Sequence, residues 1–272
     1  MARPPPLFDR DLHRKRLDRA AAGYSAHAGF LKARAAADLV ERLEAIVRDF
    51  PLAVDLGARD GAFARALNAS PARRRLGLLI ETDLSETMLG GRTTLRAAVD
   101  EERLPFADAS LDLIVSSLAL HWVNDLPGAL IQARRTLRPG GLFIAALLGG
   151  ETLGELRTVL MQAEVELLGG AAARVSPAVD AREALALLQR AGFAYPVIDV
   201  DRVSVRYAHP LSLMADIRAM GETSAFADRT GARLARATLA RACELYQAQF
   251  GEPDGRIRAT FEIVTLTGWA PA

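Results

Sequence analysis

Residues 54–61 read VDLGARDG and end a short apolar run that begins at Pro51. An apolar run that leads into an acid and two glycines is typical of a strand followed by a ligand-binding turn, where glycine lets the backbone approach a ligand. In nucleotide-binding turns a middle glycine admits a pyrophosphate. Arg59 stands at that position here. The turn therefore suits a ligand without a phosphate, provided that the Arg59 side chain points away from the pocket.

Short apolar runs alternate with helix-like segments from residue 51 onward. This alternation predicts βαβ units and an α/β fold with a doubly wound, mostly parallel sheet. The run at 111–116 is almost entirely apolar, as in strands that are covered on both faces. The seven predicted strands are residues 51–56, 76–82, 95–99, 111–116, 142–147, 196–207 and 260–267.

Helices are expected around and between these strands, and several have sequence signals at their ends. Ser85 is a natural N-cap after the second strand,. Residues 152–155 (TLGE) match a capping box, and residues 180–183 (DARE) open a helix that Gly192 ends,. Further helices are predicted at 17–46 (one or two), at 61–68, from about 125 to the RPGG sequence at 138–141, and in an insertion at about 211–250 before the last strand.

A chain of 272 residues is long enough to bury a substantial core, and residues 1–272 are expected to form a single domain,. In this division residues 1–50 contribute lid helices that close over a cofactor. Residues 51–150 form the core that binds the cofactor, and residues 151–272 supply the closing strands with the helical insertion.

The composition is that of an ordinary globular protein, with 50% hydrophobic and 25% charged residues,. A net charge of +1 gives no reason to expect a nucleic-acid partner,. The single cysteine, Cys243, excludes a disulfide within the chain and the usual cysteine-ligated zinc and iron–sulfur sites,. The apolar run at 142–148 is too short to span a bilayer, and residues 1–16 lack the apolar segment of a secretory signal,. We therefore expect a cytoplasmic protein with no integral membrane segment.

Acids stand at the ends of the first three predicted strands, where ligands bind in open α/β sheets. Asp55 ends the first strand, Asp83 follows the second, and Asp100 and Glu101 follow the third. A carboxylate offers two acceptor oxygens, so Asp83 suits the two hydroxyls of a ribose and an acid after the third strand suits the amine of an adenine. Alone, an acid before Leu-Ser such as Asp83 is more often a helix cap, but the convergence of the strand-end acids favours an adenosine-type ligand. With a turn that lacks the middle glycine, S-adenosylmethionine fits better than NAD.

Four stretches resemble class I S-adenosylmethionine-dependent methyltransferases, and they occur in that family's order over residues 51–148. They are VDLGARDG, ETDLSETML, VDEERLPFADASLDLIVSSLALHWV and RTLRPGGLFIAAL. The resemblance implies a Rossmann-like methyltransferase fold that holds S-adenosylmethionine at the strand ends. The cofactor-binding residues that it implies are Asp55, Gly57, Ala58 and Gly61 at the methionine part, Asp83 and Leu84 at the ribose, Asp100 and Glu101 at the adenine, Ser116, Ser117 and Leu118 beside the sulfonium, and Tyr24 in the lid.

Two subfamilies compete over nearly the whole chain. Residues 19–28 (RAAAGYSAHA) resemble the malonyl-carrier-protein O-methyltransferase of biotin synthesis. Longer stretches resemble the arginine hydroxylase known as a mitochondrial complex I assembly factor and its bacterial relatives, and these favour the second subfamily. They are FDRDLHRKR at 8–16, SSLALHWVNDLPGAL at 116–130, GGETLGELR at 149–157, MGETSA at 220–225 and TLTGWAP at 265–271.

The second resemblance implies hydroxylation of an arginine in an iron–sulfur subunit of respiratory complex I. It implies a bacterial cytoplasmic protein that meets the inner membrane only through this substrate. A carboxyl O-methyltransferase acting on a malonyl carrier protein, and an assembly chaperone without turnover, stay open as alternatives.

His121 and Trp122 follow the fourth predicted strand and are the candidate catalytic residues, since this position faces a substrate in such folds,. Core packing explains Trp122 equally well. No metal site is predicted, because none of the four histidines begins the H-x-D or H-x-E pair of an iron oxygenase. The four are His13, His27, His121 and His209.

Overall fold

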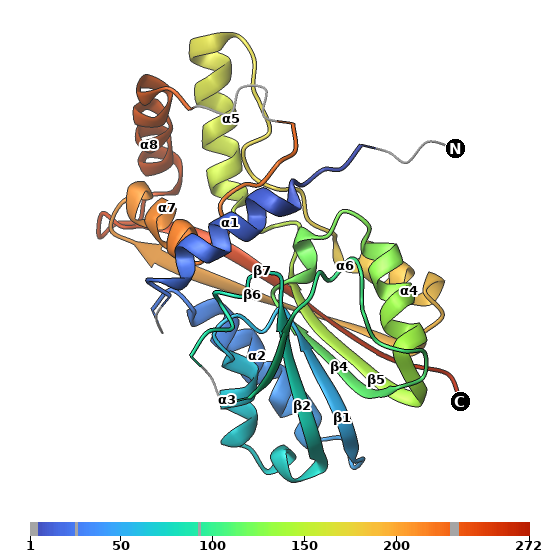
Figure 1. The fold of residues 1–272 in the computed structure, drawn as a ribbon. Helices are drawn as coiled ribbons and strands as arrows, with labels where there is room; N and C mark the ends of the chain where they lie inside the picture. Colours follow the sequence, from blue (N-terminus) through green and yellow to red (C-terminus); the bar gives the residue numbers. More distant parts are fainter. Residues whose placement is uncertain (1–4, 25–26, 92–93, 229–233) are drawn as a thin grey trace.

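The computed structural model describes residues 5–24, 27–91, 94–228 and 234–272. These residues form a seven-stranded sheet with helices on both faces (Figure 1). The motif at 19–28, the N-terminal lid and the helical insertion each include positions outside the described ranges. The strands are β1 (Phe50–Leu56), β2 (Leu76–Asp83), β3 (Leu95–Ala98), β4 (Leu111–Ser117), β5 (Leu137–Leu148), β6 (Ala194–Tyr207) and β7 (Ile257–Trp269).

The strand order is β3-β2-β1-β4-β5-β7-β6. The first five strands in this order are parallel, and β7 runs antiparallel to both β5 and β6. The prediction of a doubly wound, mostly parallel sheet is thus confirmed. The order reverses between β1 and β4, and ligands bind at such a switch point in open α/β sheets.

Side chains of the central strands alternate between the two faces of the sheet, as the twofold period of a strand requires. Ala53 and Leu113 pack on one face together with α2 (Phe30–Glu44) and α3 (Ala62–Asn68). Their neighbours in sequence pack on the other face with α4 (Leu126–Thr136) and α6 (Ala181–Arg190). The apolar run at 111–116 is therefore buried on both sides, as its composition predicts.

The remaining helices lie at the carboxyl ends of the parallel strands and beside β7. Helix α1 (Arg10–Ala21) crosses this end of the sheet (Figure 1). Helix α5 (Gly154–Leu168) follows β5, and the predicted insertion before the last strand is present as α7 (Pro210–Ala219) and α8 (Arg236–Phe250). Within the described ranges no helix is long and apolar enough to cross a membrane.

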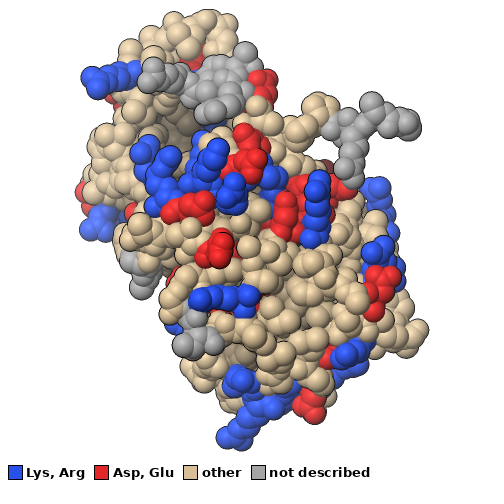
Figure 2. Space-filling model, in the orientation of Figure 1, with Lys and Arg blue, Asp and Glu red and all other residues tan. Residues whose placement is uncertain are grey.

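Helix α1 is amphipathic, and its two faces explain how it docks. His13, Leu17 and Ala20 are buried against the rest of the protein. The outer face carries exposed acidic and basic side chains, among them Asp11 and Arg14. Acidic and basic side chains lie intermixed on the face of the molecule seen in Figure 2. The N-terminal end is capped by Asp9, whose side chain accepts from the Leu12 backbone N–H,.

One predicted helix, after Ser85, is absent, and the helix predicted from 152–155 is present as α5 but without its capping box. Ser85 accepts from the Met88 backbone N–H, but the chain makes only turns there and no helix follows. The capping box at 152–155 does not form, since Thr152 and Glu155 bond to strand β7 instead of to each other. The Asp180 and Asp125 caps of α6 and α4 are present.

The turn after β1 depends on glycine at position 57. Gly57 has a φ of +72°, and a Cβ atom there would lie 2.2 Å from the Cβ atom of Ala119 in the loop after β4. Left-handed backbone is strained for any residue with a Cβ atom, and here the atom would also clash. Gly57 therefore lets two loops at the switch point touch.

We predict that Gly57→Ala lowers the free energy of unfolding by about 2–4 kcal/mol in urea denaturation, from backbone strain together with overpacking. Gly169→Ala is the matched control, because Gly169 has a φ of +72° with nothing within 4 Å of the added Cβ atom. It should cost about 1 kcal/mol, from strain alone. Equal losses in the two variants would contradict the close approach of the loops.

Candidate functional site

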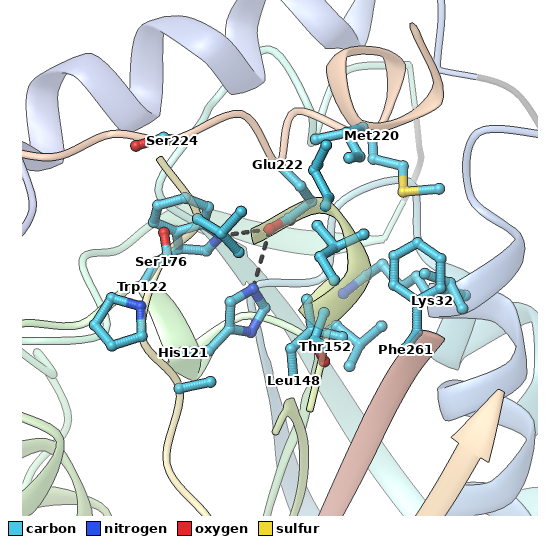
Figure 3. Close-up of a pocket in the computed structure, with 18 of the residues that line it drawn as sticks. Lys32, His121, Trp122, Leu148, Thr152, Ser176, Met220, Glu222, Ser224 and Phe261 are labelled. Carbon is cyan, nitrogen blue, oxygen red and sulfur yellow. Dashed lines mark hydrogen bonds and ion pairs between the residues drawn. The ribbon is translucent and has the colours of Figure 1, made fainter. Parts of the chain in front are cut away.

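A cavity opens beyond the carboxyl ends of β1, β4 and β5, at the switch point of the sheet (Figure 3). It encloses about 980 Å³ of empty space, including its open mouth. Its walls are mainly apolar, with a few polar groups, as in sites for small molecules or single side chains. The apolar wall includes Leu148, Leu153, Leu156, Ile217, Met220 and Phe261, and the polar groups include Tyr24, Lys32, Arg59, His121, Arg174 and Glu222.

Glu222 is the carboxylate on which the polar side of this cavity converges. Its Oε2 atom accepts from the indole N–H of Trp122 and lies 3.0 Å from Nε2 of His121. Its Oε1 atom lies 3.5 Å from a guanidinium nitrogen of Arg59. Figure 3 shows Glu222 reaching down between the two rings from the chain above the cavity. Three elements distant in sequence thus meet at one carboxylate.

The local sequence places Glu222 by ending helix α7 sharply. Gly221 has a φ of +80°, and the Glu222 backbone N–H returns to the carbonyl of Ile217. This is the left-handed glycine turn that commonly ends a helix. A Cβ atom at position 221 would lie 2.8 Å from the side chain of Leu17 in α1. The turn therefore aims Glu222 into the cavity while α1 packs closely behind it.

The environment keeps Glu222 ionised. Burial alone would raise the pKa of its carboxyl, but the neighbouring His121 and Arg59 outweigh it and lower the pKa to about 2,. The pKa of His13, which lies close by, is held well below its ordinary value by burial and by Arg59. At neutral pH the cavity thus presents a carboxylate that cations and hydrogen-bond donors stabilise.

His121 and Trp122 both reach this carboxylate, but they differ in their surroundings. Trp122 is buried, with its ring 4.4 Å from the ring of His13 and 5.1 Å from that of Phe8. The packing role expected for Trp122 is present, and its indole N–H also donates to Glu222, while a catalytic role stays a prediction. His121 lines the cavity, and its Nδ1 atom is buried with no hydrogen-bond partner in the described part of the chain.

Arg59 does not point away from the pocket, and this expectation was wrong. Its backbone has a φ of +51°, and its side chain is directed inward and is only 2% exposed. One guanidinium nitrogen lies 3.3 and 3.4 Å from the two carboxylate oxygens of Asp83. Burial would lower the pKa of Arg59, but Asp83 and Glu222 raise it. The buried Asp83 and the partly buried Glu222 therefore hold the arginine inside, which sequence periodicity alone does not show.

Asp83 uses both of its oxygens within the protein. Oδ2 accepts from the backbone N–H of Arg59 at 2.9 Å, and Oδ1 accepts from the backbone N–H of Ser85 at 2.9 Å. The guanidinium of Arg59 contacts both oxygens, and the residue is fully buried. The acid at the end of β2 thus closes its own turn and pairs with the turn after β1.

The acids after β3 hold helix α1. The guanidinium of Arg10 bonds to Asp100 at 2.7 Å and also to Glu101. Burial raises the pKa of Glu101, although Arg10 opposes the shift. Farther along α1, Leu84 packs in a cluster formed by α1 residues and by Met88. The predicted adenine side of the site therefore lies directly under α1.

Lys32 is a site residue that sequence reasoning missed. Its ammonium group reaches in from α2 and donates to the backbone carbonyls of Gly57, at 2.6 Å, and of Ser117. Burial lowers its pKa to about 8, while the nearby Asp55 opposes the shift. Lys32 therefore ties the loop after β1 to the end of β4. A signal was available, because Lys15 and Lys32 are the only lysines among 34 basic residues.

The predicted cofactor residues divide into three groups in space. Tyr24 and Leu118 line the cavity together with His121 and Trp122. A second group surrounds the turn after β1 beneath it, and a third lies under α1. The second group is Asp55, Gly57, Ala58, Gly61, Asp83, Ser116 and Ser117, and the third is Leu84, Asp100 and Glu101. Among the described residues, no group of three or more His, Cys, Asp or Glu side chains is arranged to hold a metal ion.

Residues 54–145 match the family model of a methyltransferase domain. Mitochondrial arginine-hydroxylase NDUFAF5 of Danio rerio is 38% identical over 271 residues, which cover 97% of this chain and 83% of that protein. The malonyl-[acyl-carrier protein] O-methyltransferase of Halorhodospira halophila is 36% identical, with 96% of this chain and 88% of the relative covered. The chain belongs to this methyltransferase family.

A solved structure shows the same fold at low identity. It is phosphoethanolamine N-methyltransferase 2 of Haemonchus contortus, in complex with S-adenosylhomocysteine and phosphomonomethylethanolamine. The TM-score is 0.56 at 15% identity, over 96% of this chain and 60% of that one. The methyltransferase fold implies S-adenosylmethionine as the ligand class of the strand ends.

The residues present do not fit the adenosine part of that cofactor as they stand. A ribose needs the two oxygens of the acid at the end of β2. Here both oxygens of Asp83 are taken by Arg59 and by the Ser85 backbone. Arg10 and α1 cover the acids that would meet the adenine. We call the residues around the turn after β1 the cradle: Asp55, Gly57, Ala58, Gly61, Asp83, Ser116 and Ser117. The cradle is present, but the side chains of Arg59 and Arg10 occupy the positions where adenosine would bind.

We predict an acid-sensitive contribution of Glu222 to stability. The folded pKa of about 2 lies below the ordinary value of 4.5, so the contribution is complete above pH 4.5 and is lost as pH falls toward 2,. Urea denaturation should show Glu222→Gln less stable than the parent by about 3 kcal/mol at pH 7. This gap should narrow as pH falls from about 4.5 to about 2,. A difference in stability between the two proteins that does not change with pH would contradict the pairing of Glu222 with His121 and Arg59.

Proposed function

We propose that the chain hydroxylates an arginine side chain of a protein substrate, an iron–sulfur subunit of respiratory complex I, during assembly of that complex. The cavity at the switch point receives the arginine, and the cradle beneath it is the site for S-adenosylmethionine. The observation that carries the proposal is Glu222, an ionised carboxylate on the wall of a mainly apolar cavity.

The chemistry of arginine matches this cavity at both ends of its side chain. The guanidinium is permanently charged and planar, and it pairs well with a carboxylate. The methylene stem suits apolar walls such as those made by Leu148 and Phe261,. Glu222 already accepts a guanidinium contact from Arg59, at 3.5 Å. The same oxygen, at this long distance from Arg59, has capacity for a second guanidinium.

His121 and Trp122 are proposed as the residues that hold and complete this receptor. Both contact Oε2 of Glu222, which leaves Oε1 directed to cationic partners. The Nδ1 atom of His121 is buried without a hydrogen-bond partner in the described ranges and is available to a substrate atom. We propose that His121 orients Glu222 through one nitrogen and contacts the substrate through the other.

Hydroxylation inserts one oxygen atom into a carbon–hydrogen bond of the arginine. With dioxygen as the oxidant, the second oxygen atom leaves as water, and the reaction consumes two electrons and two protons from an external reductant. The residues of the cavity are assigned to binding and orientation of the arginine in this scheme.

A malonyl carrier protein is a poorer fit to the same cavity. Its free carboxylate is negatively charged, and an anion is repelled by the ionised Glu222,. The cations that line the cavity are already engaged: Arg174 with Glu164, Arg59 with Asp83 and Glu222, and Lys32 with two backbone carbonyls. The sign of the charge at Glu222 thus favours a cationic substrate over an anionic one.

We predict that a strain lacking the gene loses the mass of one oxygen atom from an arginine of a complex I subunit. Mass spectrometry of the purified complex measures this mark. The parent gene should restore it, whereas Glu222→Gln and His121→Ala should lower it by about tenfold or more, because a charge-assisted contact is lost. Glu244→Gln, an exposed change on α8, is the control and should restore the mark.

Two outcomes would reject the proposal in different directions. A strain that needs added biotin and keeps the mark would indicate the carboxyl methyltransferase. A strain with a normal mark and defective complex I would indicate an assembly chaperone without turnover.

A further inference from the structure

We propose that Arg59 is an internal guanidinium ligand of the cofactor cradle. It occupies the place of the ribose, so that S-adenosylmethionine binds only after the guanidinium has left Asp83. This inference rests on the cofactor site proposed above and adds to it a residue of this chain that sets the affinity. It follows from the contacts of the Arg59 guanidinium with Asp83 and with Glu222.

The first contact is with the acid that the ribose needs. Asp83 is fully buried, and the guanidinium of Arg59 contacts both of its carboxylate oxygens. The backbone N–H groups of Arg59 and Ser85 take up one further acceptor position on each oxygen. Ribose hydroxyls therefore cannot add to Asp83 as a further pair of donors. They must replace the guanidinium.

The replacement is unfavourable on electrostatic grounds. Arg59 and Asp83 are both buried, and a buried charge that loses its partner is strongly destabilising,. Ribose hydroxyls are neutral donors, so they satisfy hydrogen bonds but do not neutralise the carboxylate. The cradle thus favours its own arginine over the ribose.

The second contact shows where the displaced side chain can go. Arg59 lines the cavity, and its other guanidinium nitrogen lies 3.5 Å from Glu222. A movement toward this carboxylate keeps the arginine paired while it releases Asp83. Arg59 can therefore exchange between two carboxylates, and the ligand is excluded only in the position described by the structure.

The backbone at position 59 is strained in this arrangement. Its φ of +51° lies in the left-handed region, which glycine adopts freely and arginine does not,. The long side chain compensates for that strain by its buried ion pair. Glycine at this position removes the strain and opens the space at Asp83 in one step.

The test is isothermal titration of the purified full chain with S-adenosylmethionine and, separately, with S-adenosylhomocysteine. Arg59→Gly should bind both ligands at least about tenfold more tightly than the parent, because no charge-assisted pair has to be broken. Arg65→Ala is the matched control, since it removes an exposed guanidinium whose partner is Asp60 rather than Asp83. It should bind like the parent.

A second variant and a competitor keep the test decisive. Arg59→Ala removes the same guanidinium without changing the residue to glycine, and it should also gain affinity. In both variants millimolar ethylguanidinium should compete with S-adenosylmethionine, because the two share Asp83. Cooperative urea unfolding of each variant shows that it is folded.

Equal or weaker binding by both folded Arg59 variants would overturn the inference, as would an absence of binding in the parent and both variants. A gain without competition by ethylguanidinium would overturn the shared site. These titrations contain no protein substrate, so they can fail while the arginine mark is present, and the mark can be absent while they succeed.

Discussion

A buried arginine between two carboxylates organises the switch point of this sheet. Arg59 joins the turn after β1 to Asp83 at the end of β2 and to Glu222 after α7. The Arg59 guanidinium and the Asp83 carboxylate stabilise each other, because a buried charge without a counter-charge is destabilising,. Glu222 in turn receives His121 and Trp122 from the loop after β4. The cavity, its charge and the state of the cradle all follow from this arrangement.

Much of the fold was predictable, because local patterns determine it. Apolar runs marked the seven strands, and Asp180 was recognised as a helix cap from its immediate neighbours. The contacts of the site were not predictable in the same way. Arg59 and Glu222 are 163 residues apart, and only the folded chain brings them together. Thr152 failed as a cap for the same reason, since a carbonyl of β7 lay within its reach.

The site also shows why a shared fold does not decide the reaction. The relatives at 38% and 36% identity are named as an arginine-hydroxylase and a malonyl-[acyl-carrier protein] O-methyltransferase. Function resides in the groups that face the substrate. In this chain the cavity proposed for the substrate presents an ionised carboxylate between apolar walls, while the acids proposed for adenosine are engaged by Arg59 and Arg10. The proposed substrate cavity is thus better prepared for a ligand than the proposed cofactor site.

The central claim is the coupling of Arg59 to Asp83, and a double-mutant cycle measures it most directly. The cycle compares the urea unfolding of the parent, Arg59→Met, Asp83→Asn and the double variant at pH 7, without any ligand. The account predicts that the double variant is more stable than the sum of the single losses implies, with a coupling energy of about 2 kcal/mol or more. Losses that add to within about 0.5 kcal/mol would contradict it, because independent residues behave in that way.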